Sequence, residues 1–333
     1  MMLLLACVWL GGCAPVSVQL TLFADSAKLV ETTVEADRNY GENKVALIDV
    51  RGLIAERTEA GLFSNGSSSV DELACRLKRA ELDPQVKAVI LRINSPGGTV
   101  TASDMMYREV RRFEEETKKP VIASFGEVAA SGGYYLGLSA DRIIAEPTSI
   151  TGSIGVIIPT VNFSEGLARI GITSRSVKSG KNKDLGNPLE PAREEHFAVL
   201  QTTVDEFYAG FKALVVERRG RAAGEGMTTL DRAQLDDLTD GRIVTGARAV
   251  AVGLADQTGG IRDAFRVAKS MAKIERARLV KYYPEGGERP RSAYAQSDTP
   301  RAGETEINLL QIRGGALGTA GMGGAYYLWL PPG

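Results

Sequence analysis

The sequence predicts an α/β fold in which a mainly parallel sheet is covered by helices on both faces. Short apolar runs rich in β-branched residues alternate with segments whose apolar residues recur every three or four positions. Strands that alternate with helices form βα units, and their strands lie parallel and buried. The 333 residues are 44% hydrophobic and 24% charged, enough for one large core or two medium ones.

The first half of the chain predicts strands followed by helices. Apolar runs at 44–54, 86–93 and 121–125 predict strands, and the second run leads directly into NSPGG at 94–98. Helical spacing at 70–77 and 106–113 predicts a helix after each of the first two strands. Each helix should end before a proline, because proline disfavours the helical conformation of the residue that precedes it.

In the second half, DRIIAEP at 141–147 and SIGVIIPTVNF at 153–163 are further strand candidates, and SEGLARIG at 164–171 predicts a short helix. A long amphipathic helix follows. Its apolar stripe, which we expect to lie in the core or in a subunit interface, comprises Phe197, Leu200, Val204, Phe207, Phe211 and Leu214.

Composition divides the chain into segments. We expect a signal segment at 1–13, a connecting segment at 14–43 and the α/β domain at 44–284. From 285 to 306 the sequence turns to Gly, Pro, Ser, Arg and Glu, which predicts a flexible linker. Residues 307–333 form a glycine-rich, then apolar, tail. It can dock on a neighbouring subunit or enter a cleft, and docking is favoured because an exposed apolar tail promotes association.

The N-terminal run MMLLLACVWLGGCAP is apolar up to Cys13 and is too short to span a membrane. It resembles the h-region of a secretory signal, and LGGC resembles the lipobox of bacterial lipoproteins, in which the cysteine is lipidated. No Lys or Arg precedes Cys13, so the usual positive region is missing. The open alternatives are a lipoprotein, a simple signal or anchor, and a core strand of a cytosolic protein. The first places the protein in the bacterial cell envelope, anchored to the membrane through Cys13.

Several classes of function are disfavoured by residue counts. A net charge of −1 gives no basic patch for nucleic acid. With three cysteines and one histidine, the chain lacks the ligands of a typical zinc site, and it has no Walker loop or dinucleotide fingerprint. We therefore expect no metal or organic cofactor. Cys75 would be alone once Cys7 is removed and Cys13 is lipidated, so no disulfide is expected.

The stretch EVAASGGYYLGLSADRI, 127–143, places Ser131 and two glycines where a strand turns into a helix. That position suits a nucleophile with an oxyanion-binding amide beside it. A Ser-His-Asp triad would need His196, which lies on the amphipathic helix and is expected at the surface. A lysine can serve as the base instead, and SVKSGKNKDLGNP at 176–188 offers Lys178, Lys181 and Lys183 without distinguishing them.

Five motifs in this order resemble the signal peptide peptidase A (protease IV) family of membrane-associated serine peptidases. They are INSPGG at 93–98, AASGGYYLGLSADRI at 129–143, TGSIGV at 151–156, SGKNKD at 179–184 and DGRIVTGARAVAVGLADQTGG at 240–260. The resemblance implies a Clp-protease/crotonase-like fold of repeated ββα units. It also implies that Ser131 is the nucleophile, that Lys183 is the general base, and that Ser153 helps to orient the lysine.

The chemistry fits these roles. The amide of Gly132 would bind the oxyanion together with that of Gly98, while Gly97 lets the backbone approach closely. Lys183 must reach the Ser131 hydroxyl, and an apolar environment would lower the lysine pKa so that it can accept a proton. The neighbouring carboxylate of Asp184 would favour the charged lysine, so we expect it to point away.

The expected function is a membrane-associated serine endopeptidase that cleaves unfolded peptides, including cleaved signal peptides. The chain corresponds to the short, single-copy form of the family, which implies a ring-like homo-oligomer in which the lysine can come from a neighbouring protomer. Two alternatives remain: an enoyl-CoA hydratase-like enzyme, which uses the same paired amides on a thioester, and a non-catalytic membrane scaffold.

Overall fold

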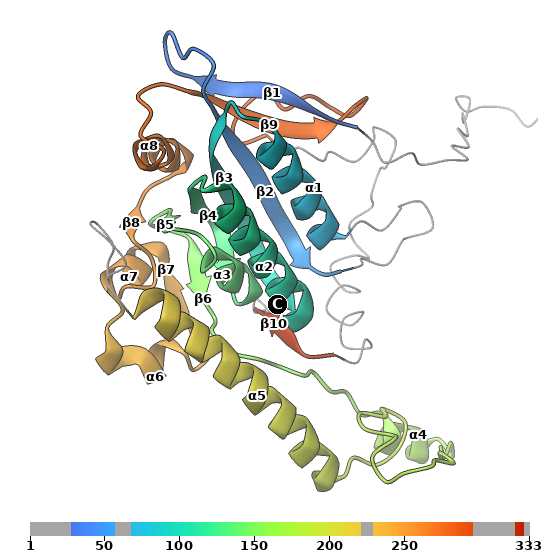
Figure 1. Cartoon of the computed structure of the whole chain (residues 1–333). Coiled ribbons are helices and arrows are strands. Elements are labelled where there is room, and N and C mark those ends of the chain that lie inside the picture. The colour runs from blue at the N-terminus through green and yellow to red at the C-terminus, as the bar shows by residue number, and fades with distance from the viewer. Residues whose placement is uncertain (1–27, 57–67, 221–228, 296–323, 330–333) are drawn as a thin grey trace, which may run out of the picture.

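The computed structural model of the chain describes residues 28–56, 68–220, 229–295 and 324–329. The predicted signal segment with Cys13, and most of the predicted tail, lie outside the described residues. A single mixed sheet forms the centre of the molecule, in the order β1-β9-β2-β3-β4-β5-β8 (Figure 1). Its strands are β1 (Leu29–Ala36), β2 (Lys44–Ile54), β3 (Val86–Thr99), β4 (Val121–Ala130), β5 (Arg142–Ala145), β6 (Ile150–Gly152), β7 (Ile243–Thr245), β8 (Gln257–Thr258), β9 (Arg278–Pro284) and β10 (Tyr326–Leu328).

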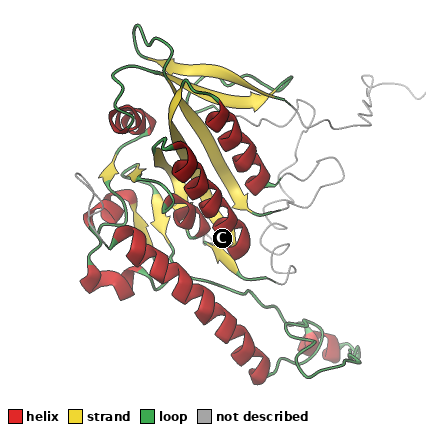
Figure 2. Cartoon of the chain, viewed as in Figure 1, coloured by secondary structure: helices red, strands yellow, loops and turns green. Residues whose placement is uncertain are grey.

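Helices cover both faces of this sheet (Figure 2). They are α1 (Ser69–Leu82), α2 (Val100–Thr117), α3 (Gly132–Gly137), α4 (Ser164–Arg169), α5 (Glu194–Arg219), α6 (Leu235–Leu238), α7 (Gly246–Ala251) and α8 (Ile261–Met271), with a 3-10 turn at Arg232–Gln234. Among the described residues, none of these helices is both long and apolar enough to cross a membrane.

The central strands run parallel from β9 through β2, β3, β4 and β5 to β8, which confirms the predicted α/β class. Alternate residues of each strand enter two cores. On one face, Leu91 and Ile93 of β3 pack with α1, α2 and α3. On the other face, Ala88 and Ile90 pack with Phe265 of α8. Since both faces are covered, the strands read as continuous apolar runs in the sequence.

The predicted ββα units are present, because each of three long strands consists of two parts and is followed by a helix. The pairing of β2 with β3 shifts register between Arg51 and Leu53. The pairing of β3 with β4 shifts between Ile93 and Ser95. Strand β4 then pairs first with β5 and, from Val128, with β6. The second parts of β3 and β4 lead into the motifs SPGG and AASGG.

Two predicted boundaries need correction. The segment at 14–43 is more than a connection, because β1 lies in it and pairs antiparallel with β9 at the sheet edge. The predicted linker at 285–306 is tied to the body in its described part, although most of residues 285–295 are exposed: Ala293 is buried and Arg92 donates to the carbonyls of Ala293 and Tyr294. The low apolar content of residues 285–295 did not predict this packing, in which backbone carbonyls of the segment accept hydrogen bonds.

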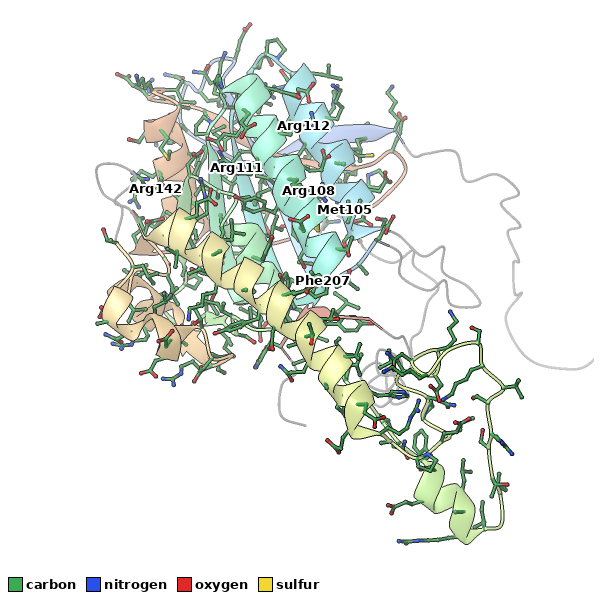
Figure 3. The ribbon with its side chains drawn as sticks, turned by 60° about the horizontal axis from the view of Figure 1, so that its bottom comes forward. Met105, Arg108, Arg111, Arg112, Arg142 and Phe207 are labelled. Atoms are coloured by element: carbon green, nitrogen blue, oxygen red, sulfur yellow. The ribbon has the colours of Figure 1, made fainter. Side chains whose placement is uncertain are left out.

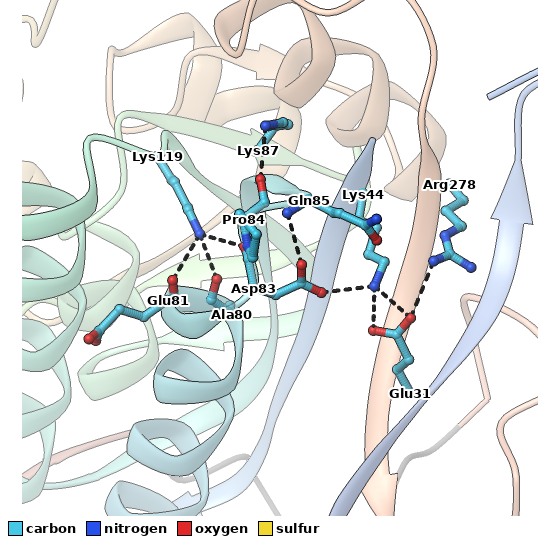
Figure 4. A network of polar contacts seen from close by, with 10 residues as sticks. All are labelled: Glu31, Lys44, Ala80, Glu81, Asp83, Pro84, Gln85, Lys87, Lys119 and Arg278. Atoms are coloured by element: carbon cyan, nitrogen blue, oxygen red, sulfur yellow. Dashed lines mark hydrogen bonds and ion pairs between the residues drawn. The ribbon is translucent and has the colours of Figure 1, made fainter. Parts of the chain in front are cut away.

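A polar network ties the C-terminal end of α1 to the sheet (Figure 4). Lys44 of β2 forms ion pairs with Asp83, which caps α1, and with Glu31 of β1, each at 2.8 Å. Lys119 donates to three carbonyls at the end of α1. This network therefore joins the first strand–helix unit to β1 and to the loop that enters β4.

The chain leaves the body after β6 and forms an arm, which contains α4 and the N-terminal half of α5 (Figure 1). The predicted strand at 153–163 is wrong, because β6 ends at Gly152 and only Ile157 makes a further bridge, with Tyr326. Ile154 at its start is fully buried in the core, whereas Val161 and Phe163 at its end are exposed. The short helix predicted at 164–171 is confirmed as α4, and the long helix as α5.

Candidate active site

Ser131 lies at the turn between β4 and α3, as predicted. Its backbone has φ 53° and ψ −115°, a sparsely populated conformation for a residue with a side chain. Two hydrogen bonds hold it there: the Ser131 N–H donates to the Gly152 carbonyl at 2.8 Å, and Tyr135 N–H donates to the Ser131 carbonyl at 2.8 Å. A strained serine at a strand-to-helix turn is the geometry that presents a hydroxyl nucleophile.

The Ser131 hydroxyl is enclosed and has no hydrogen-bond partner among the described residues. The residue is 1% exposed, and its Oγ is buried. A buried hydroxyl without a partner is destabilising, and such groups mark catalytic or strained sites. Helix α3 is only six residues long, so the nearby positive character comes from individual N–H groups rather than from a long helix dipole.

Gly97, Gly98 and Gly132 pack closely together beside Ser131, as their predicted roles require. A Cβ on Gly132 would lie 3.1 Å from the Gly98 nitrogen and 2.4 Å from Ser103 Oγ. Gly97 has φ +104°, which strains any other residue, and a Cβ there would lie 2.7 Å from the Gly132 nitrogen. Only glycines allow the two backbone segments to approach so closely.

Ser95 orients this glycine segment, and the sequence analysis did not identify it. Its hydroxyl donates to the Gly52 carbonyl at 2.6 Å and accepts a hydrogen bond from Gly97 N–H at 3.1 Å. Because the Gly97 amide is engaged in this way, Gly98 is the amide of this segment left for an oxyanion. The serine of the SPGG motif was visible in the sequence, but its role depends on the neighbouring strand β2.

Ser153 follows β6, next to the residue that holds Ser131. It is 7% exposed and has φ 49°. Its N–H donates to the Arg242 carbonyl at 2.7 Å, which links it to the downstream motif at 240–260. Ser153 is therefore brought to the same region as Ser131, and its role in orienting the lysine stays a prediction.

Lys183 is not brought to Ser131 within one chain. It lies exposed in the turns that precede α5, on the arm, whereas α3 lies in the body (Figure 1). Asp184 points away from it, as expected, and pairs with Lys178 and Arg193. The hydrogen bond from Lys178 and the charges of Arg193 and Lys178 hold the pKa of Asp184 below its ordinary value.

The expectation that His196 lies at the surface is wrong. The residue is 8% exposed, because it sits between the first turn of α5 and the loop that carries the lysines. Its Nε2 lies 3.1 Å from the Lys181 carbonyl, and its ring also contacts Arg193 and Asp184. All these contacts belong to the arm, so His196 supports the lysine loop and has no contact with Ser131.

Strand β10 lies directly against the SPGG segment. It pairs antiparallel with the end of β3, with Tyr327 opposite Gly98. The expectation that this apolar stretch docks on a neighbouring subunit is therefore not what the structure shows, since residues 326–328 bind their own chain. The signal for it was the continuous run of large apolar residues in YYLWL, which is typical of a buried strand but does not identify the pairing partner.

An aromatic cluster lines the site behind Ser131. The ring of Tyr327 stacks on that of Tyr135 with centroids 5.1 Å apart, and it lies 4.7 Å from the ring of Phe211 of α5. Tyr135 also contacts Tyr107 edge to face and donates to Asp104 at 3.1 Å. Tyr134 is buried in the core, and Tyr135 lines the site.

The described residues contain no group of three or more His, Cys, Asp or Glu side chains that could hold a metal ion.

Comparisons with known proteins point to one family. The model of peptidase family S49 matches residues 114–275. A protein of Enterococcus faecium named as a signal peptide peptidase SppA is 34% identical over 261 residues, which cover 78% of this chain and 72% of that protein. Protease 4 of Salmonella typhi is 34% identical over 245 residues, or 72% of this chain and 37% of that longer protein.

Among solved structures, a mutant of the 1510-N membrane-bound stomatin-specific protease aligns with a TM-score of 0.42 and 17% identity, covering 68% of this chain and 84% of that one. The assignment rests on the sequence relatives, which extend over most of both chains in the Enterococcus comparison. The chain therefore belongs to the signal peptide peptidase A family of serine peptidases, peptidase family S49.

Proposed function

We propose that the protein is a membrane-associated serine endopeptidase that uses a Ser131–Lys183 dyad to cleave extended peptides. The observation that carries this proposal is the Ser131 hydroxyl, which is buried without a partner beside the glycine amides at 98 and 132. Nothing in the packing of the body requires a polar group there. The position of the Ser131 hydroxyl is explained if it is a nucleophile whose base and acyl substrate come from outside this chain.

In the proposed reaction, Lys183 accepts the proton of the Ser131 hydroxyl as its oxygen attacks the carbonyl carbon of the scissile peptide bond. The amides of Gly98 and Gly132 donate to the oxyanion that forms, and each such donor is worth about 3 kcal/mol of transition-state stabilisation. The C–N bond then breaks, and the leaving amine takes the proton from the lysine. Water hydrolyses the resulting ester and regenerates the serine.

We infer that the lysine comes from a neighbouring protomer of a ring-like homo-oligomer. Within one chain the serine has no partner, and the lysine loop lies on an arm that leaves the body. The arm also carries exposed large apolar side chains, which favour burial in an interface. They are Phe163, Ile170, Ile172, Val177, Leu189 and Phe197. Docking of this arm would bury Lys183 and lower its pKa, as a base requires.

The proposed substrates are unfolded or membrane-released peptides, including cleaved signal peptides. The relative from Enterococcus carries the name of a signal peptide peptidase, and the edge of β3 beside Gly98, which pairs with the extended strand β10, suits an extended peptide backbone. We further propose membrane anchoring in the bacterial cell envelope, on the basis of the apolar N-terminal run and Cys13.

Labelling with a fluorophosphonate probe tests the dyad. We expect the assembled protein to be labelled, and Ser131→Ala to abolish labelling because the probe reacts with an activated serine. Lys183→Ala should reduce the labelling rate by at least about a hundredfold, since general-base catalysis contributes that much or more. The readout is the labelled fraction by intact-protein mass spectrometry.

Lys181→Ala is the matched control, because Lys181 lies two residues away in the same exposed loop. It should be labelled like the parent. Oligomer mass, measured for every variant, separates loss of chemistry from loss of assembly. An assembled parent that stays unlabelled would contradict the dyad and would favour the hydratase-like enzyme or the scaffold.

A further inference from the structure

The strand that leads to Ser131 is irregular. Residues 126–128 of β4 lie opposite the single residue Asn94 of β3, where the register between the two strands shifts. A bulge of this kind bends the strand and changes the direction of the side chains that follow it. It also interrupts the ladder, so the buried backbone groups of the bulge need other partners.

Side chains from two neighbouring segments supply such partners. Asn94 Oδ1 accepts a hydrogen bond from the Val128 N–H at 2.9 Å. Ser149, which directly precedes β6, is fully buried, and its hydroxyl donates to the carbonyl of Gly126. The bulge is therefore held from β3 on one side and from the start of β6 on the other.

Thr151 acts closest to the serine. It is fully buried in β6, which lies beside β4 (Figure 1), and its hydroxyl donates to the Ala129 carbonyl at 2.6 Å. The next residue, Gly152, accepts the hydrogen bond from the Ser131 N–H at 2.8 Å. Consecutive residues of β6 thus hold the chain on both sides of Ala130, the first through its side chain and the second through its backbone.

We infer that Thr151, supported by Asn94 and Ser149, is a positioning residue for the nucleophile. The backbone of Ser131 has φ 53° and ψ −115°, a conformation that persists only where the surrounding structure fixes it. The contacts of the bulge and of β6 provide that constraint. The inference rests on the proposed function, in which Ser131 attacks the substrate. Thr151 acts through the β4 backbone, because its hydroxyl is already bonded there.

The same anchoring joins the two halves of the site. Asn94 holds the strand that carries Ser131, and the next residue, Ser95, orients Gly97 in the SPGG segment. Attack requires the Ser131 hydroxyl and the oxyanion-binding amides to keep a fixed relative position. A displacement of about 1 Å can lower the rate of such a reaction about a hundredfold. Loosening β4 should therefore impair the chemical step while leaving the binding of substrate intact.

Thr151→Val keeps the shape of the side chain and removes its hydroxyl. In the assembled full chain we expect the maximal rate constant of fluorophosphonate labelling to fall at least about tenfold, while the half-saturating probe concentration stays within about twofold. Thr151→Ser keeps the hydroxyl and should stay within about threefold of the parent. If Thr151→Val does not assemble, Ser149→Ala removes the bond to Gly126 and should show the same pattern, with labelling at least about fivefold slower.

Thr117→Val is the matched control, because the Thr117 hydroxyl also donates to a backbone carbonyl, that of Phe113 at 2.7 Å. Helix α2 begins next to the SPGG motif, and Figure 3 shows Met105, Arg108 and Arg112 successively further along it; Thr117 is its last residue. Both valine variants lose a hydrogen bond of the same kind, but Thr117→Val should be labelled within about twofold of the parental rate. Equal reductions in the two variants would overturn the inference.

Hydrogen exchange of the Ser131 amide separates this inference from the proposed function. Its protection reports how firmly β6 holds the strand, whether or not the serine reacts. Thr151→Val should raise its exchange rate at least about tenfold, whereas Thr151→Ser and Thr117→Val should change it little. If the parent stays unlabelled but exchange follows this order, only the peptidase proposal fails. If the parent is labelled and Thr151→Val matches it in labelling or in exchange, the positioning role fails and the dyad stands.

Discussion

Glu114 is a single residue whose surroundings make the stability of the protein depend on pH. It lies on the last turns of α2, with its side chain 22% exposed and in contact with Arg111. Burial, together with a hydrogen bond to Asp141 and the negative charge of that residue, raises the pKa of Glu114 to about 7. The charge of Arg111 acts in the opposite direction, and burial and the second carboxyl prevail.

The sign of the effect follows from proton binding. In the unfolded chain a glutamate titrates near 4.3, so between that value and about 7 the folded chain binds more protons. The contribution of Glu114 to stability therefore decreases as pH rises through this window and is largest below it. Allowing for screening by solvent and by Arg111, we expect a loss of about 1–2 kcal/mol between pH 4.5 and pH 8.

Glu114→Gln should remove this loss, since an amide does not titrate. We expect the variant to match the parent at pH 5 and to exceed its unfolding free energy by about 1 kcal/mol at pH 8, measured by urea denaturation. Glu115→Gln is the control, because that side chain is 68% exposed on the same helix and should have no such effect. An identical pH dependence in parent and Glu114→Gln would contradict the argument.

At the scale of single elements, the end of α1 depends on one lysine from outside the helix. Lys119 Nζ donates to the carbonyls of Ala80, Glu81 and Asp83 at 2.7, 3.2 and 2.9 Å (Figure 4). The last carbonyls of a helix have no partner within it and carry partial negative charge, so a cation there is favourable. Lys119 thereby ties α1 to the loop that enters β4.

Lys119→Met keeps the aliphatic stem and removes the ammonium group. We expect it to lower the unfolding free energy by about 1–3 kcal/mol, the cost of charged hydrogen bonds to buried acceptors. Lys87→Met is the matched control, since Lys87 donates to one exposed carbonyl, that of Pro84. Its change should stay within about 0.5 kcal/mol. Equal effects of the two substitutions, measured by urea denaturation, would show that the three contacts add nothing.

The elements also show what periodicity can and cannot predict. The strand predicted at 44–54 is β2 with the same bounds, because a strand buried on both faces is a continuous apolar run. The apolar run at 153–163 has a similar composition, yet it forms the exposed start of the arm. Apolar content alone does not reveal whether a partner strand exists. Edge strand β1 was missed for the converse reason, as its glutamates and threonines, one of which is buried, conceal the alternation.

At the scale of the whole molecule, the short motifs predicted where the site lies, but they did not predict which distant segments pack against it. Ser131, Gly97, Gly98, Gly132 and Ser153 were predicted from short motifs, and the fold brings all five together because their contacts are mostly between backbone atoms near strand ends. The pocket residues from α5 and β10 were not predicted. Those contacts join segments more than a hundred residues apart, and no local pattern specifies such pairings.

The arm raises the remaining question of whether the dyad forms within a chain or between chains. The apolar stripe of α5 changes character along the helix: Phe211 is fully buried in the body, whereas Phe197 and Phe207 are 41% and 36% exposed. A stripe that continues beyond the body of its own chain favours contact with another copy. The same half of the helix is linked through His196 and Arg193 to the loop that carries Lys183.

Mixing two inactive variants tests this arrangement. Ser131→Ala keeps the lysine and Lys183→Ala keeps the serine, so co-assembled rings would restore sites wherever a serine from one variant meets a lysine from the other. Random 1:1 assembly should recover about one quarter of the parental peptidase activity, since each site needs the intact residue from each of two neighbours. Each variant assembled alone should remain inactive. If the dyad forms within one chain, the mixture stays as inactive as its components, while the oligomer mass shows that the two variants have combined.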